Sequence, residues 1–100
     1  MPASTRAYRR RLSAEDADTG TILITKDRWS MFPEPMREFP VRVGRRRLDT
    51  RIVAEHCNCV PPPHQHLHLE AGHLRHLLDW RKGAVIEIAR DGDGYVLRNG

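Results

Sequence analysis

Apolar residues in this sequence occur in short runs, and several of the runs alternate with polar residues at a period of two. Leu48–Ala54 places apolar or small side chains at every second position, with charged residues between most of them. Gln65–Leu69 alternates leucines with histidines. Period-two alternation is typical of a strand that buries one face. The chain is therefore predicted to fold mainly from β-strands.

Glycines and charged turns bound the other expected strands. Gly20 precedes the β-branched run Thr21–Thr25, which predicts a buried strand. The turn Asp91–Gly94 separates the apolar run Ala84–Ala89 from Tyr95–Leu97. Glycines alternating with aspartates between two such runs predict a hairpin.

Two short segments carry helical signals. Asp27 can cap one or two helical turns that Pro33 ends, so a short helix is expected near Arg28–Phe32. Helical spacing of apolar residues predicts a second helix over Ala71–Asp79. Six or seven short strands with two short helices predict a mainly β (α+β) fold, a small open or closed β-barrel.

The N-terminal segment differs in character from the rest. Met1–Thr19 contains four arginines followed by three acidic residues, and its only large apolar residues after Met1 are Tyr8 and Leu12. Such a segment has too little to bury to offset its ordering entropy. We therefore expect a flexible tail over residues 1–19 and a single β-barrel domain over residues 20–100.

The charge balance favours an anionic partner. Seventeen Lys and Arg stand against thirteen Asp and Glu, for a net charge of +4, and nearly all the basic residues are arginine. The arginine fork matches phosphate oxygens and guanine edges, although GC-rich coding DNA also enriches arginine. With no run of about 18 apolar residues and no apolar signal core, a cytoplasmic protein without a membrane partner is expected.

Arginines concentrate in one predicted hairpin. Val41–Arg51 carries five arginines and one aspartate, so its local charge is +4. These arginines are Arg42, Arg45, Arg46, Arg47 and Arg51. A surface of this kind attracts phosphate backbones whatever the base sequence. The five arginines are therefore one candidate nucleic-acid-binding set.

All six histidines and both cysteines lie within residues 56–76. Zinc prefers thiolate and imidazole ligands, so a small zinc-binding protein is an alternative, with Cys57, Cys59, His64 and His66 as ligands. A single residue between the two cysteines is fewer than structural zinc sites use. The simpler interpretation is that the histidines lie on the surface and bind no metal. No cofactor is therefore expected, except zinc under this alternative.

The sequence lacks the patterns of the common catalytic sites. It has no serine in a nucleophile-elbow pattern and no phosphate-cradling glycine loop. Asp91–Gly94 lacks the ligand spacing and the final glutamate of a calcium-binding loop. We therefore expect that the chain is not an enzyme.

Two segments carry a resemblance to a known family. Ile22–Asp27 is a strand that runs into a charged turn, and Leu77–Ile86 leads from a helix through a glycine turn into a strand. With the elements between them, residues 21–98 resemble the B3-type DNA-binding pseudobarrel. That fold occurs in plant transcription factors and in the DNA-recognition domains of some restriction endonucleases. The resemblance implies a non-enzymatic module that binds double-stranded DNA in a restriction or regulatory system.

In that family, two loops at one end of the barrel grip the major groove. The matching segments here are Thr25–Arg28 and His56–His66. The resemblance therefore adds four candidate nucleic-acid-binding residues, Lys26, Arg28, His64 and His66. The second loop departs from the family in carrying two cysteines and three prolines where basic residues are usual.

A protein-interaction domain without ligand chemistry is the remaining alternative.

Overall fold

The computed structural model describes residues 7–57 and 64–100, without the side chains of residues 56, 57 and 64. The elements in chain order are β1 (Ala7–Arg11), α1 (Ala14–Thr19), β2 (Thr21–Ile24), the 3-10 helix η2 (Lys26–Met31), β3 (Phe39–Val43), β4 (Arg46–Thr50), β5 (Ile52–Cys57), β6 (His64–Glu70), the 3-10 helix η3 (Arg75–Leu77), β7 (Val85–Asp91) and β8 (Gly94–Asn99). Strands dominate these ranges, as the sequence predicted.

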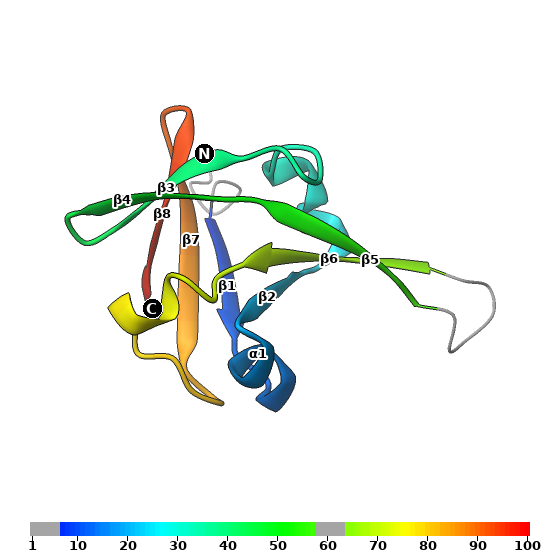
Figure 1. Cartoon of the computed structure of the whole chain (residues 1–100), viewed down its shortest axis with the longest axis horizontal. Coiled ribbons are helices and arrows are strands. Elements are labelled where there is room, and N and C mark those ends of the chain that lie inside the picture. The colour runs from blue at the N-terminus through cyan, green and yellow to red at the C-terminus, as the bar shows by residue number, and fades with distance from the viewer. Residues whose placement is uncertain (1–6, 58–63) are drawn as a thin grey trace.

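The strands form two sheets around one core (Figure 1). The larger sheet has the order β1-β7-β8-β3-β4, and the smaller has the order β2-β6-β5. Neighbouring strands are antiparallel, except that β3 and β8 run parallel. This is the small, mainly β barrel with short helices that the sequence predicted.

The core is built by alternate residues of strands from both sheets. Ile22 of β2 and Leu69 of β6 are neighbours in the smaller sheet, and both are fully buried. Ile88 of β7 and Leu97 of β8 are neighbours in the larger sheet and are equally buried. Each such side chain contributes about 1.5–3 kcal/mol through burial. The period-two pattern thus places one face of each sheet in the core.

Residues 7–19 are ordered, which corrects the expectation of a flexible tail. Strand β1 pairs with β7 along its whole length. Tyr8 is only 6% exposed and Leu12 only 2% exposed. Three of the five β1 residues are arginines, which is why the sequence predicts a tail here and not a strand. The domain therefore includes residues 7–19, while residues 1–6 of the expected tail lie outside the described residues.

Helix α1 is held by a reciprocal cap at its first turn. The Ser13 hydroxyl accepts the backbone N–H of Asp16, and the Asp16 carboxylate accepts the N–H of Ser13. The same carboxylate lies 2.9 Å from Nε of Arg10 and is 3% exposed. Gly20 ends the helix with a φ of 74°, a left-handed conformation that suits glycine. These contacts order a segment that has little apolar surface of its own.

The two expected helices are present as 3-10 helices, and the second is much shorter than expected. The predicted helix near Arg28–Phe32 is the 3-10 helix η2. The predicted helix over Ala71–Asp79 is corrected to a turn followed by the single 3-10 turn η3. The backbone N–H of Ala71 bonds to Gly20 instead of extending a helix, while Leu74 still reaches the core. In the described ranges, no helix has the length and apolar character needed to span a bilayer.

The predicted strand over residues 48–54 is divided between the two sheets. Strand β4 ends at Thr50 in the larger sheet, and β5 begins at Ile52 in the smaller. Arg51 lies at the junction. Thr50 and Ile52 are both buried, because both sheets face the same core. The alternation of buried and exposed residues therefore continues from β4 into β5, and the sequence pattern alone does not show where the chain changes sheet.

Candidate nucleic-acid interface

The two basic regions predicted from the sequence lie apart, the arginine hairpin at one end of the molecule and the other region beside the middle of β6 (Figure 1). We use "arginine hairpin" for β3, β4 and the turn between them, and "β2–η2 corner" for Thr25–Arg28. The longest dimension is 43 Å. The arginine hairpin lies at one end of this axis, and the free ends of β5 and β6 point toward the other (Figure 1). The predicted residues therefore form two surfaces.

The β2–η2 corner adjoins β6. Ile24, the last residue of β2, pairs with Leu67 of β6. The next residue of β6 toward the free end is His66, so the corner follows β2 at the level of this histidine. The structure thus brings Lys26, Arg28 and His66 to the same end of the smaller sheet.

The start of η2 is fixed against the end of β2. The indole N–H of Trp29 donates to the carbonyl oxygen of Ile24 over 3.0 Å. Nζ of Lys26 lies 6.0 Å from the centroid of the Trp29 ring. The side chain of Arg28 is 32% exposed, and its Nε lies 3.8 Å from a carboxylate oxygen of Asp27. The corner therefore presents two cations on a backbone that is anchored to the sheet.

The histidines of β6 lie on the outer face of the smaller sheet. His66 and His68 are half-buried, while Leu67 between them is buried, as the sequence alternation predicted. The centroids of the two imidazole rings are 6.4 Å apart. Glu55 of β5 is the register partner of His66. Nδ1 of His68 is buried and has no hydrogen-bond partner among the described residues.

The zinc alternative gains no support from the described residues. Among them, no three His, Cys, Asp or Glu side chains are grouped as they would have to be to hold a metal ion. The backbone register places Cys57 of β5 opposite His64 of β6. Cys59 lies outside the described residues, as do the side chains of Cys57 and His64. The set Cys57, Cys59, His64 and His66 therefore stays a prediction.

The arginine hairpin exposes its basic side chains. Gly44 allows the tight turn with a φ of 61°. Arg45, Arg46 and Arg47 are all exposed. Within residues 7–57 and 64–100, no carboxylate lies within ion-pairing distance of these three arginines. They remain available to an external anion.

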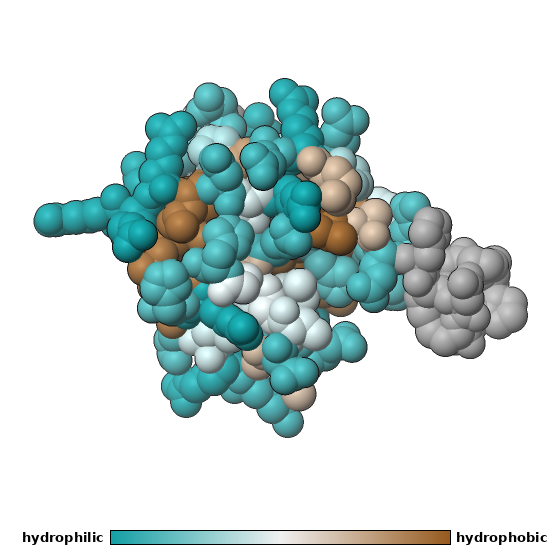
Figure 2. Space-filling view, viewed as in Figure 1, coloured by the Kyte–Doolittle hydropathy of each residue, from teal (hydrophilic) through white to brown (hydrophobic). Residues whose placement is uncertain are grey.

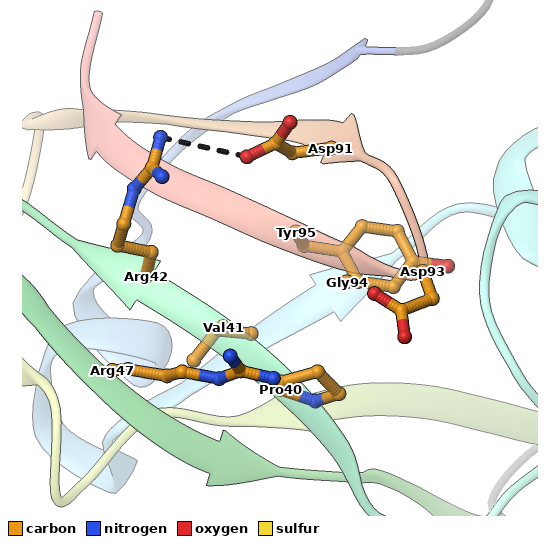
Figure 3. A pocket seen from close by; sticks show the side chains of 8 residues that line it. All are labelled: Pro40, Val41, Arg42, Arg47, Asp91, Asp93, Gly94 and Tyr95. Atoms are coloured by element: carbon orange, nitrogen blue, oxygen red, sulfur yellow. Dashed lines mark ion pairs between the residues drawn. The ribbon is translucent and has the colours of Figure 1, made fainter.

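Part of the hairpin charge is balanced by the β7–β8 turn. Arg42 and Arg47 are register partners on β3 and β4. They line a hollow of about 210 Å³ with Asp91 and Asp93 (Figure 3). Nη2 of Arg42 lies 3.4 Å from a carboxylate oxygen of Asp91. Two arginines and two aspartates leave this hollow without net charge, so the positive charge is greatest nearer the turn.

Arg51 does not belong to the hairpin surface. Its Nε lies 2.8 Å from a carboxylate oxygen of Glu70 on β6. The hydrogen bond and the charge of Glu70 raise the pKa of Arg51 above its ordinary value. This arginine joins β6 to the junction between β4 and β5, so its contact is structural.

Sequence reasoning missed a groove beside the β2–η2 corner. Arg9, Arg10 and Arg11 of β1 line it together with Arg28, Asp27 and neighbouring residues, and its volume is about 730 Å³. Arg10 is committed to Asp16, and Nη1 of Arg11 donates to the carbonyl of Gly83. The alternation of the apolar Tyr8 with Arg9 is the sequence signal for this strand. It is weak because arginines dominate the segment, so the sequence predicts a tail. The groove extends the basic surface at the corner.

Comparison with known proteins identifies the fold. No protein-family model and no curated protein sequence matches the chain. The structure titled "Arabidopsis FUS3-DNA complex" is similar, with a TM-score of 0.69 and 14% sequence identity. The similarity covers 92% of this chain and 93% of that chain. At this identity the likeness concerns the fold, and the chain has the B3-like pseudobarrel fold that its sequence resembles.

Proposed function

We propose that this chain is a non-enzymatic module that binds double-stranded DNA. The observation that carries the proposal is the fold, since nearly the whole chain matches a protein whose structure is a DNA complex. The net charge of +4 agrees with a phosphate-bearing partner. The module would serve as the recognition domain of a restriction or regulatory system.

The proposed contact surface is the β2–η2 corner with the adjoining end of β6. Arg28 would offer a fork to guanine edges, and Lys26 would offer a point charge to phosphate. His66 supplies a ring nitrogen that can hydrogen-bond phosphate. The groove along β1 continues the surface and would follow the DNA backbone. The anchoring of η2 by Trp29 supports this role, because a fixed backbone positions side chains for base contacts.

The test is duplex binding by fluorescence anisotropy at about 50 and about 200 mM salt. The wild-type affinity should fall with salt at a slope of about −0.9 per phosphate neutralised. The double variant K26Q/R28Q should bind at least about tenfold more weakly, since one lost base contact costs roughly 1–3 kcal/mol. Sequence preference should also relax, because base contacts carry specificity.

The matched control is R81Q/K82Q, which removes the same charge from an exposed turn. Its affinity for DNA should stay within about threefold of the wild type. This variant weakens only the general electrostatic attraction to DNA and removes no proposed contact. Equal losses in the two variants would show attraction by net charge without a site. Absence of any binding below ~100 µM at low salt would contradict DNA binding, because even non-specific binding is usually tighter.

A further inference from the structure

The arginine hairpin faces away from the proposed contact surface. Strands β4 and β5 follow each other directly around Arg51. Strand β4 leads back to the arginine hairpin, and β5 leads out to the opposite end of the long axis (Figure 1). The hairpin tip lies at one end of the 43 Å long axis, and the β2–η2 corner lies beside β2 and β6, away from that end (Figure 1). A duplex held at the β2–η2 corner and the groove along β1 would lie on a different part of the surface from the hairpin tip (Figure 1).

The hairpin tip presents arginines in several directions. Arg45 lies in the turn, and Arg46 and Arg47 project to opposite faces because successive strand residues alternate. In Figure 2, hydrophilic side chains extend outward from this end of the molecule. Residues Gly44–Arg47 at the tip include no aromatic or aliphatic side chain. Arginine binds phosphate through paired hydrogen bonds, so a tip that carries three arginines and no aromatic residue is suited to phosphate.

The pairing of Arg42 with Arg47 also favours an anion at this end. Like charges directly opposite each other on neighbouring strands destabilise a sheet. Asp91 relieves this for Arg42 through the 3.4 Å contact, whereas Arg47 has no ion pair with a described residue (Figure 3). A bound phosphate would give Arg47 the ion-pair partner that the described residues do not provide.

We infer that the arginine hairpin is a second phosphate-binding surface, through which one chain holds two DNA segments at once. The inference rests on the proposed function, because it requires the first duplex to bind at the β2–η2 corner. The hairpin contacts are to the backbone and carry no base preference. The chain would thus join a recognised site to any second stretch of DNA.

The experiment counts short duplexes bound to one chain by native mass spectrometry, which also counts the protein copies. Duplexes of about 10 base pairs are about 34 Å long, which is shorter than the protein's 43 Å long axis and favours contact with one surface for each duplex. The wild type should form a complex of one chain with two duplexes. The variant R45Q/R46Q/R47Q should stop at one duplex, and K26Q/R28Q should also stop at one.

Bridging gives a second readout: capture of a fluorescent duplex by an immobilised one should fall at least about tenfold in the hairpin variant. The control R75Q/R81Q/K82Q loses the same charge from exposed positions elsewhere and should still bridge. A wild type that binds one duplex and never two overturns the inference but leaves the proposed function. A hairpin variant that still binds two also overturns it, and a chain that binds none overturns both.

Discussion

The phenolic hydroxyl of Tyr8 donates a hydrogen bond of 2.7 Å to the backbone carbonyl of Leu23. Tyr8 belongs to β1 at the edge of the larger sheet, and Leu23 belongs to β2 at the edge of the smaller. This bond joins two strands that share no ladder in the described sheets. It therefore attaches the N-terminal strand to the barrel and links the edge strands of the two sheets.

Replacing Tyr8 by Phe should destabilise the fold by about 1 kcal/mol. The substitution keeps the ring in the core and removes only the hydroxyl, so the Leu23 carbonyl loses its donor. Urea denaturation of Y8F and wild type measures the difference. Identical midpoints would show that water replaces the lost donor at no cost.

Deletion of residues 1–12 should abolish cooperative thermal unfolding. The deletion removes β1, the partner of β7, and exposes the pocket that Leu12 fills. The point variant L12A should cost roughly 2–5 kcal/mol through the cavity it leaves. A truncated chain that still melts cooperatively near the wild-type temperature would restore the view of this segment as a dispensable tail.

Replacing Gly94 by Ala should destabilise the hairpin of β7 and β8. A Cβ at this position would lie 2.7 Å from the backbone oxygen of Pro40, which cannot move without displacing β3. We expect a loss of roughly 1–3 kcal/mol, in the range of overpacking. Gly72 is the matched control, because a Cβ there meets nothing within 4 Å. Equal melting temperatures for G94A and G72A would contradict the crowding.

The stability of the fold should decline above pH about 10 through Tyr95. Burial raises the pKa of Tyr95 above its ordinary value of 10.0, and Arg90 offsets part of the rise. The folded state therefore keeps the proton to a higher pH than the unfolded chain. The associated stability is complete below the unfolded pKa and is lost as pH rises toward the folded pKa.

The measurement is the free energy of unfolding as a function of pH, in the wild type and in Y95F. The variant should be less stable near neutral pH, because it loses the hydrogen bond to the Met31 carbonyl. Its alkaline decline should be shallower, since the titrating group is gone. Parallel curves would show that Tyr95 titrates alike in both states.

Most of the barrel could be predicted from local patterns, because each strand carries its own alternation. Ile22 and Ile24 are buried as the β-branched run predicted, and the hairpin around Gly44 lies where expected. Strand β1 was missed because its burial depends on distant partners. Arg10 can lie beside the core only because Asp16 neutralises it, and Tyr8 needs the carbonyl of Leu23.

The candidate site was predictable in residue type and less so in arrangement. Exposed basic residues at Lys26 and Arg45 follow from charge and turn position alone. The separation of these residues depends on the placing of β2 and β4 in different sheets, and the alternation hides the change of sheet at Arg51. The pairing of Arg42 with Asp91 likewise required the parallel contact of β3 with β8.

The strand order has a consequence for synthesis on the ribosome. Ala7 in β1 pairs with Ala89 in β7, and β3 depends on β8 for its second neighbour. The smaller sheet, made of β2, β5 and β6, has all its strands before either of these partners emerges. During synthesis, β1 and the arginine hairpin therefore stay without these partner strands until β7 and β8 emerge. Their charged side chains oppose aggregation of the unpaired strands during this time.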